Sequence, residues 1–311
     1  MSGSIAARFT ISLGGMTTAS ADMQGKIVVI TGANAGIGRA TARALAARGA
    51  HVVMACRSRE RGEETRAAIA AEVGAAARLE VAQLDVADLR SVVEFAAQLR
   101  RRHPKIDVLI NNAGAWWLER KTSPQGHELQ WATNVLGPHL LIKLLQEPLR
   151  AAGGRVVNVA STAAGGLDLA DVDWESRKYD GIKAYSATKQ ADRMLSWAWH
   201  DRLAGAGVTV NAMSPGLVAT DFNRSAAGFF KFMFKVMRPF SRTPEKGADT
   251  VVWLASAPEL AGESGGFYED RKRRPCKFNE PAGVAALWDV LERHVAGFDA
   301  APRADLPGSA A

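Results

Sequence analysis

Cysteine, tyrosine and long uncharged apolar stretches are all scarce in this sequence. The chain of 311 residues has 2 cysteines, Cys56 and Cys276, which excludes a disulfide framework and predicts a cytoplasmic, reducing location. No uncharged apolar stretch reaches the roughly 18 residues that a membrane-spanning helix requires, so we expect no transmembrane segment. Because the chain has only 3 tyrosines, a tyrosine beside a cationic side chain is unusually informative.

Basic residues outnumber acidic ones, with a net charge of +7 and an isoelectric point near 9.6. Four of the basic residues form one run, RKRR, at 271–274, and most of the others alternate with acids along predicted helices. This alternation is typical of a solvated surface. A nucleic-acid site requires basic groups spread over one face, with groups that stack on bases or enter a groove. We therefore expect no nucleic-acid partner.

The composition predicts one long domain between two short ends. Residues 1–24 are rich in Ser, Thr, Ala and Gly and predict a flexible N-terminal extension, and residues 301–311 predict a flexible tail. No linker or low-complexity break interrupts residues 25–300, so we expect a single domain there.

Strand-like and helix-like stretches alternate along this domain. The strand-like stretches are short and rich in Val and Ile, and crossover-length stretches of helix formers separate them. Predicted strands lie at 26–32, 51–56, 79–85, 106–114, 154–161, 208–216 and 265–269, and predicted helices at 37–49, 58–73, 88–102, 127–151, 184–204 and 244–257. The pattern predicts an α/β fold: a single doubly wound Rossmann-type domain with a parallel sheet of about seven strands and helices on both faces.

Three glycines lie where the first predicted strand passes into its helix. Gly32 suits a tight turn, while Gly36 and Gly38 suit a close approach of a pyrophosphate to the helix amino end. The spacing is Gly-x-x-x-Gly-x-Gly, which differs from the common dinucleotide fingerprint, Gly-x-Gly-x-x-Gly. A tight turn without any ligand is the alternative interpretation.

Arginines stand where the second predicted strand ends. An enzyme that uses NAD places a carboxylate there for the ribose hydroxyls, but no carboxylate occurs between His51 and Arg59. Arg57 follows the strand, and Arg61 lies one helical turn further on. Guanidinium groups bind a 2′-phosphate through charge-assisted hydrogen bonds. We therefore predict NADP(H), with two solvated surface arginines as the alternative.

A Tyr-x-x-x-Lys pair offers a proton donor. Tyr185 and Lys189 are one helical turn apart and share a helix face. A phenol has an ordinary pKa near 10, and an adjacent ammonium favours the phenolate. Ser161 follows another predicted strand, where its hydroxyl is available to bind a substrate carbonyl. Taken separately, each feature also occurs by chance on an ordinary surface.

Together these motifs resemble the short-chain dehydrogenase/reductase family over about residues 25–270. The ordered set consists of TGANAGIG (31–38), LDV (84–86), NNAG (111–114), Asn134, VVNVAS (156–161), YSATK (185–189) and SPGLVATD (214–221). MACRSRERGEE (54–64) and GGFYEDRKRRP (265–275) further resemble the branch of retinol dehydrogenases and the WW-domain-containing oxidoreductase.

The resemblance implies an oxidoreductase that transfers a hydride between nicotinamide and a carbonyl or alcohol. The implied catalytic residues are Asn134, Ser161, Tyr185 and Lys189. Tyr185 acts as general acid or base, and Lys189 lowers its pKa and binds the ribose. Ser161 orients the substrate oxygen, and Asn134 holds a water of the proton relay. No metal is implied. The implied cofactor-binding residues are Gly32, Asn34, Gly36, Ile37, Gly38, Arg57, Arg61, Asp85, Val86, Asn112, Ala113, Gly114, Tyr185, Lys189, Pro215, Gly216 and Thr220.

Two features depart from the family pattern. Ala160 replaces a serine that usually precedes the catalytic one, which we expect to be harmless. Ser161 and Tyr185 are 24 residues apart, and the inserted residues 165–183 resemble a loop that borders the substrate entrance in the retinol dehydrogenase-like branch. Membrane members of that branch carry an amino-terminal anchor, which we do not find here.

The segment 221–240 is expected to form a substrate lid. It contains five phenylalanines within residues 222–234, and Lys231, Lys235 and Arg238 share one helical face. We predict a small lipophilic carbonyl or alcohol as substrate, and the basic face also suits contact with an anionic membrane surface. A helix packed on the core is the simpler interpretation.

Two further questions are left open by the sequence. A catalytically silent, cofactor-binding regulatory protein of the same fold is the alternative function, because a fold does not establish turnover. The outer faces of helices 127–151 and 184–204 suit a homo-oligomer interface, or equally a solvated surface.

Overall fold

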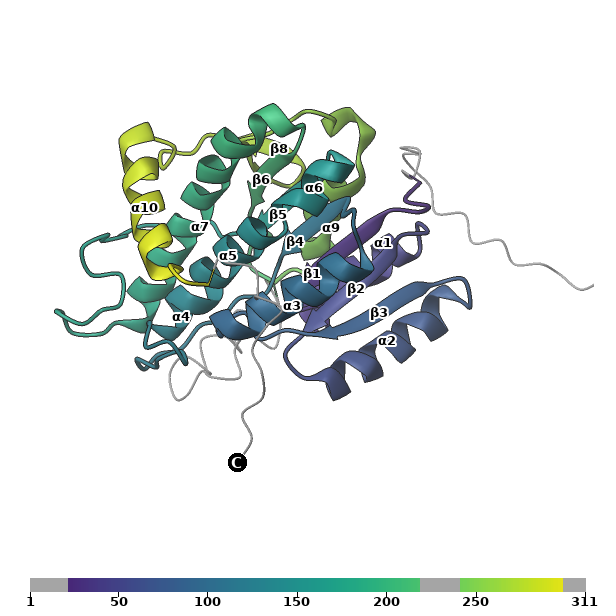
Figure 1. The fold of residues 1–311 in the computed structure, drawn as a ribbon, viewed down its shortest axis with the longest axis horizontal. Coiled ribbons are helices and arrows are strands. Elements are labelled where there is room, and N and C mark those ends of the chain that lie inside the picture. The colour runs from purple at the N-terminus through teal and green to yellow at the C-terminus, as the bar shows by residue number, and fades with distance from the viewer. Residues whose placement is uncertain (1–21, 219–240, 299–311) are drawn as a thin grey trace, which may run out of the picture.

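Eight strands form one sheet in the order β3-β2-β1-β4-β5-β6-β7-β8 (Figure 1). The structure is a computed structural model that describes residues 22–218 and 241–298. The strands are β1 (Ile27–Thr31), β2 (His51–Cys56), β3 (Arg78–Gln83), β4 (Val108–Asn111), β5 (Arg155–Val159), β6 (Thr209–Met213), β7 (Phe267–Glu269) and β8 (Lys272–Arg274). The predicted tail, the predicted lid and most of the predicted N-terminal extension lie outside the described residues.

The strand order reverses between β1 and β4. From β1 the chain winds outward through β2 to β3, and from β4 it winds the other way through β5 and β6 to β7, with every pair parallel. Ligands of such sheets bind in the crevice that opens at the carboxyl ends of the strands beside this switch. The predicted doubly wound α/β fold is therefore confirmed.

Helices cover both faces of the sheet (Figure 1). The α-helices are α1 (Gly36–Ala46), α2 (Arg59–Val73), α3 (Leu89–Arg102), α4 (Leu129–Trp131), α5 (Gly137–Leu144), α6 (Gln146–Ala152), α7 (Gly181–Leu203), α9 (Pro244–Ser256) and α10 (Pro281–His294); η1 (Ala132–Leu136) is a π-helix, and η2 (Ala204–Ala206) and η5 (Pro258–Leu260) are 3₁₀ turns. Helices α1 and α9 pack together on one face, and α3, α5 and α7 lie on the other, with α10 against α7.

The strands explain why two cores form. Val28 and Ile30 contribute to the core under α1 and α9, whereas Val29 between them contributes to the core under α3, α5 and α7. Successive side chains of a strand point to opposite faces, so a continuous apolar run is buried on both sides. The central strands are anchored in this way, which fixes the crevice above their carboxyl ends.

The sheet has one strand more than the predicted seven. Asp270 and Arg271 have φ angles of 51° and 57°, which suit the two-residue turn of a tight hairpin. The chain therefore reverses after β7, and β8 pairs antiparallel to it. The basic run 271–274 supplies this turn and strand. Arg271, Arg273 and Arg274 form ion pairs with neighbouring acids, and a charged edge strand discourages pairing with another sheet.

Helix boundaries also differ from the prediction. The predicted helix 127–151 is divided into α4, η1, α5 and α6, because one wide π-turn at Ala132–Leu136 interrupts the α-helical ladder and the chain bends again at Leu145. Helix α7 begins at Gly181, where Asp180 caps it. Helix α10 was not predicted. No helix in the described ranges is both long and apolar enough to cross a membrane.

Candidate active site

The four predicted catalytic residues lie around the carboxyl end of β5 and the first turns of α7. Tyr185 and Lys189 are one turn apart on α7, and Lys189 Nζ is 6.0 Å from the centroid of the Tyr185 ring. Ser161 follows β5 directly after Ala160. Asn134 lies in the π-helix η1, and π-turns are frequent at functional sites.

Lys189 is buried and held from two sides. Its ammonium donates to the carbonyl oxygen of Val159, at the end of β5, and to Asp192 Oδ2, each at 2.9 Å. Burial lowers the pKa of Lys189, but the carboxylate of Asp192 and the phenol of Tyr185 outweigh burial, so the net shift is upward. The ammonium therefore stays charged at neutral pH beneath the half-buried Tyr185. Asp192 was not predicted, although its position three residues after Lys189 on a helix was a usable signal.

Asn134 uses its whole side chain to join three segments. Its Oδ1 accepts from the backbone N–H of Ala115 at 2.8 Å, and its Nδ2 donates to the Ala115 carbonyl at 3.0 Å and to Thr188 Oγ1 at 2.9 Å. It thereby fixes the segment after β4 against α7, beside Lys189. These bonds position the neighbouring segments, and the water of the proton relay stays a prediction.

Ser161 is positioned through its backbone. Its carbonyl oxygen accepts from both Nε and Nη2 of Arg193, and the Arg193 guanidinium stacks on Phe267, 3.8 Å from the ring centroid. The Ser161 hydroxyl accepts from the backbone N–H of Ala163 at 3.1 Å. That bond leaves its own proton available to a substrate oxygen. Arg193 was not predicted, because its role depends on a loop that is distant in the sequence.

A buried chain of hydrogen bonds connects the strand ends to α7. Asn111 Nδ2 donates to Asn158 Oδ1 at 2.8 Å, and Asn158 Nδ2 donates to Ser196 Oγ at 2.9 Å. Ser196 in turn donates to the backbone carbonyl of Asp192 at 3.4 Å. Buried polar groups that satisfy one another make a region rigid. These contacts therefore fix α7 relative to β4 and β5.

The glycine-rich turn is shaped by the protein itself as well as by any ligand. Gly32 has a φ of 67°, in the left-handed region that favours glycine. A Cβ on Gly38 would lie 2.3 Å from the Gly32 carbonyl oxygen and 2.6 Å from Asn112 Nδ2. The absent side chain of Gly38 therefore makes room for the turn and for Asn112, and the close approach of a pyrophosphate stays a prediction.

The amino end of α1 is open to an anion. Its first residues include Gly36, Ile37 and Gly38, and the N-cap residue, Ala35, makes no side-chain hydrogen bond to them. Backbone N–H groups at such an end lack an intrahelical partner, and the helix dipole favours negative charge there. The predicted pyrophosphate therefore fits this end of the helix.

Arg57 and Arg61 are exposed beside this turn. Arg57 follows β2, Arg61 lies in the first turn of α2, and no described carboxylate pairs with either guanidinium. In contrast, Arg39 and Arg43 on α1 both pair with Glu72. Two unpaired guanidiniums at this edge fit the 2′-phosphate of NADP(H).

Thr31, which was not predicted, joins the two central strand ends. Its Oγ1 accepts from the backbone N–H groups of Asn112 and Ala113 at 3.0 and 2.9 Å. Asn112 Nδ2 returns a hydrogen bond to the Thr31 carbonyl at 2.8 Å. These bonds hold the predicted cofactor-lining segment, which continues to the exposed Gly114, beside the glycine turn.

Other predicted cofactor residues border the same crevice. Asp85 and Val86 follow β3, and Asp85 Oδ1 accepts from the backbone N–H of Ala87 at 3.0 Å. The carbonyl of Asn34 accepts from Thr65 of α2 at 3.1 Å, which ties the glycine turn to that helix.

Beyond β6, Pro215 and Gly216 lead towards the segment that the structure does not describe. Gly216 has a φ of 72°, and the Arg242 guanidinium lies against it. Arg242 pairs with both oxygens of Asp270, at 2.5 and 3.0 Å. Thr220 and the predicted lid 221–240 lie outside the described residues.

The inserted loop between β5 and α7 is anchored onto the segment before α4. His127 Nδ1 lies 3.0 Å from Asp173 Oδ2, and Tyr179 donates to Glu128 Oε1 at 2.9 Å. Burial raises the pKa of Glu128, and burial together with Glu128 raises that of Tyr179 as well, so the phenol keeps its proton and donates it in this hydrogen bond. The second half of the loop is therefore anchored to the segment before α4.

Comparison with known proteins identifies relatives along almost the whole chain. A family model described as short chain dehydrogenase matches residues 26–228. Human retinol dehydrogenase 13 is 37% identical over 292 residues, which cover 91% of this chain and 88% of that protein. A Streptomyces sp. (strain C5) protein named as a daunorubicin C-13 ketoreductase is 38% identical over 276 residues, covering 86% of this chain and 92% of that protein.

Solved structures share the same architecture. One from Beutenbergia cavernae, described as an NAD(P) dependent gluconate 5-dehydrogenase with bound NADP at low occupancy, has a TM-score of 0.64 and 28% sequence identity. The alignment covers 79% of this chain and 95% of that one. These likenesses agree with the motifs and the strand order of the present chain.

Proposed function

Since the chain belongs to the short-chain dehydrogenase family, we propose that it is an NADP(H)-dependent oxidoreductase that interconverts a lipophilic alcohol and its carbonyl, with Tyr185 as general acid and base. Membership of the family already makes it an oxidoreductase of alcohol and carbonyl groups. The choice of NADP(H), the residue roles and the substrate class are the proposal.

One observation carries the assignment of Tyr185. A charged, buried ammonium lies 6.0 Å from its ring centroid, and that ammonium is held by Val159 and Asp192. A nearby positive charge in a poorly solvated site favours the phenolate, which brings proton transfer by the phenol closer to neutral pH. The hydroxyl of Ser161 is available to bind the substrate oxygen. The bound nicotinamide supplies the hydride chemistry.

Groups at the carboxyl ends of β1 and β2 support the choice of NADP(H) as cofactor. The open amino end of α1 suits the pyrophosphate, and the exposed guanidiniums of Arg57 and Arg61, which pair with no carboxylate of the described residues, suit a 2′-phosphate. The solved neighbour with bound NADP has the same fold. Asn112 to Gly114, Asp85 and Pro215 to Gly216 would line the rest of the cofactor, and Thr220 would complete the set from outside the described residues.

The substrate class rests on the named relatives and on the composition of 221–240. Retinol and the daunorubicin C-13 ketone, after which two relatives are named, are bulky molecules with large apolar parts. Five phenylalanines within residues 222–234 would line a large apolar pocket. We expect kcat/KM to rise with chain length in a series of aldehydes or ketones. Flat or falling efficiency would contradict the lipophilic substrate. The cytoplasmic location, the homo-oligomer and the membrane contact stay predictions.

The first experiment removes the phenol hydroxyl. Tyr185→Phe should reduce turnover by about 10²–10⁴-fold, as expected for a positioned acid or base, and should leave cofactor binding nearly unchanged. Tyr268→Phe is the matched control, because it removes a hydroxyl from β7. Near-normal turnover in Tyr185→Phe would exclude the mechanism, whereas the absence of turnover in the unchanged protein with every substrate of the series would favour the catalytically silent alternative.

The second experiment exchanges the charge at the end of β2. Arg57→Asp should weaken NADPH binding by about 2–4 kcal/mol, because a charge-assisted contact is lost and repulsion is added. Arg59→Asp makes the same charge change two residues away, on an exposed turn of α2, and should have a smaller effect. NADH that binds the unchanged protein as tightly as NADPH would refute the cofactor assignment.

A further inference from the structure

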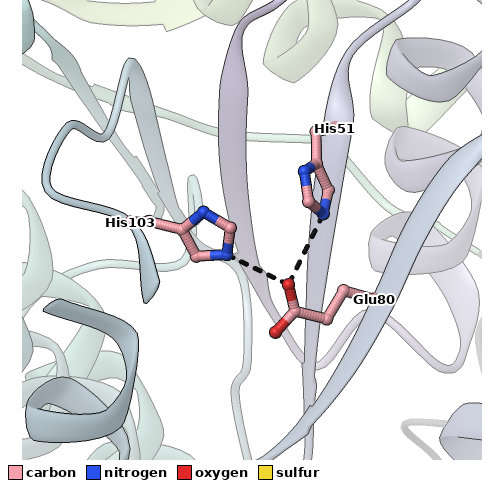
Figure 2. A group of neighbouring side chains, drawn as sticks. All are labelled: His51, Glu80 and His103. Atoms are coloured by element: carbon pink, nitrogen blue, oxygen red, sulfur yellow. Dashed lines mark hydrogen bonds and ion pairs between the residues drawn. The ribbon is translucent and has the colours of Figure 1, made fainter. Parts of the chain in front are cut away.

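Two histidines and a glutamate meet at the amino edge of the sheet (Figure 2). His51 is the first residue of β2, Glu80 lies in β3, and His103 follows α3. Both imidazoles direct Nε2 at the same carboxylate oxygen, Glu80 Oε2, at 3.4 Å from His51 and 3.0 Å from His103. The rings are perpendicular, with centroids 5.2 Å apart.

These separations suit a metal ion. The three ligand atoms all lie within 4.8 Å of one another. A zinc ion bonds to imidazole nitrogen and carboxylate oxygen at about 2.0–2.2 Å, so its ligand atoms lie about 3–3.5 Å apart. Imidazole nitrogens select ions such as Zn²⁺, Co²⁺ and Ni²⁺ over Mg²⁺ and Ca²⁺, which prefer oxygen.

The second carboxylate oxygen has its own partner. Arg102, next to His103, pairs with Glu80 Oε1. Glu80 is therefore oriented without help from any ion, and Oε2 remains directed at the two rings. A hydrogen-bonded carboxylate ligand of this kind is typical of the surroundings of bound metals.

The imidazoles are able to present lone pairs. No described residue makes a hydrogen bond to Nδ1 of His51 or His103, so each ring is free to carry its proton there. Burial lowers the pKa of both rings, and the positive charge of Arg102 lowers it further. The side chains are 28%, 22% and 11% exposed for His51, Glu80 and His103, which leaves room for water at the remaining coordination positions.

A second histidine cluster in the same molecule shows an arrangement in which a protein group already occupies a ring nitrogen. His127, Asp173 and His294 also lie close together, with the two rings stacked 4.3 Å apart. There the indole N–H of Trp131 donates to His294 Nδ1 at 3.3 Å. A neutral imidazole that accepts at Nδ1 carries its proton on Nε2. Nδ1 of His294 is therefore already bound to a protein group, and this cluster serves as a control.

We propose that His51, Glu80 and His103 bind one divalent transition-metal ion, Zn²⁺ by their chemistry. The ion would join the starts of β2 and β3 to the end of α3. The site is separate from the proposed cofactor and catalytic sites: the whole of β2, about 20 Å of extended chain, separates His51 from Arg57 at the opposite edge.

The test is a titration of tag-free, chelator-treated full chain with ZnCl₂ by calorimetry, and with CoCl₂ by visible absorption. We expect one Zn²⁺ per chain and the absorption of Co²⁺ bound through nitrogen and oxygen. His103→Ala and Glu80→Gln should each weaken binding by about tenfold or more, since each removes one of three ligands. His294→Ala should leave the affinity unchanged.

The thermal midpoint provides an independent measurement, because an ion that binds only the folded state stabilises it. Zn²⁺ should raise the midpoint of the wild-type protein and of His294→Ala, and should raise that of Glu80→Gln much less. Less than one bound ion in the wild-type protein would overturn the proposal. Unchanged affinity in both His103→Ala and Glu80→Gln would overturn it as well.

Discussion

Two lysine–aspartate pairs with the same 2.9 Å contact lie at opposite edges of the sheet. Lys189 and Asp192, at the carboxyl edge, are 5% and 4% exposed, whereas Lys26 and Asp107, at the amino edge, are 51% and 18% exposed. An exposed ion pair contributes little to stability, while a broken buried pair leaves an uncompensated charge. The contact distance is the same, so burial decides what each pair does.

The surroundings of the two pairs follow the direction of the strands. Asp107 also accepts from the backbone N–H of Ile27 at 2.9 Å, so its pair fastens the starts of β1 and β4. Lys189 is connected instead to the end of β5 and lies beneath Tyr185. In a doubly wound sheet the ligand crevice opens at the carboxyl ends. The same ion pair is thus structural at one edge and part of the proposed chemistry at the other.

The largest expected difference is in turnover. Lys189→Met should lower kcat/KM by about 10²–10⁴-fold, because the phenol of Tyr185 loses the charge that favours its ionised form, and should also weaken cofactor binding. Lys26→Met, the matched change at the amino edge, should leave both parameters near wild type. Steady-state kinetics with NADPH and an aldehyde would measure both, and similar losses in the two variants would contradict the comparison.

Stability should differ next. Asp192→Ala leaves the Lys189 ammonium buried without its carboxylate and should cost about 3–5 kcal/mol of unfolding free energy. The pKa of Lys189 is raised in the folded wild-type protein. The stabilisation that this lysine contributes is therefore fully present at any pH below its pKa in the unfolded chain, and it is lost only as the pH rises through its pKa in the folded protein. In Asp192→Ala the carboxylate that opposes burial is gone and burial lowers the pKa of Lys189, so the variant becomes relatively more stable as this lysine loses its proton. The cost in urea unfolding should therefore be largest near pH 6 and should decrease towards about pH 9. A cost below about 1 kcal/mol would mean that solvent reaches the pair.

A glycine pair compares the two edges without charge. Gly38→Ala should cost about 1–3 kcal/mol, because the added Cβ would lie 2.3 Å from a backbone oxygen that cannot move freely. At Gly25, near the start of β1, φ is 74° and nothing lies within 4 Å of an added Cβ. Gly25→Ala should therefore lower the unfolding free energy only by the backbone strain of a left-handed alanine, about 1–2 kcal/mol. NADPH binding should fall in Gly38→Ala alone. Equal NADPH affinity in the two variants would contradict the role of this turn.

The smallest effect is expected for the exposed pair itself. Lys26→Met should change the unfolding free energy by less than about 1 kcal/mol, and the difference should disappear in about 1 M salt, where exposed charges are screened. Unfolding of Lys26→Met and the wild-type protein at low and high salt would measure this. A loss above about 2 kcal/mol that persists in salt would show that the amino-edge pair is not a surface pair.

Local patterns explain what was predictable. The run of Val and Ile in each central strand and the glycine turn after β1 depend on neighbouring residues, so the doubly wound fold was predicted. The hairpin to β8 depends on positive φ angles at Asp270 and Arg271, which ordinary residues seldom adopt, and it was missed. The π-turn at Asn134 was missed because a single wider turn leaves the apolar periodicity almost unchanged.

The sequence by itself determined the alternation of the seven parallel strands with helices along the chain, the glycine turn, and the spacing of Tyr185 and Lys189, because each depends on residues within a few turns of one another. Only the tertiary structure decided that Arg193 holds the carbonyl of Ser161, 32 residues away, and that His51 and His103 meet at Glu80. These contacts depend on strand order and register, which bring distant segments together. Burial is likewise a property of the folded chain, and it is the reason why we expect different roles for Lys189 and Lys26.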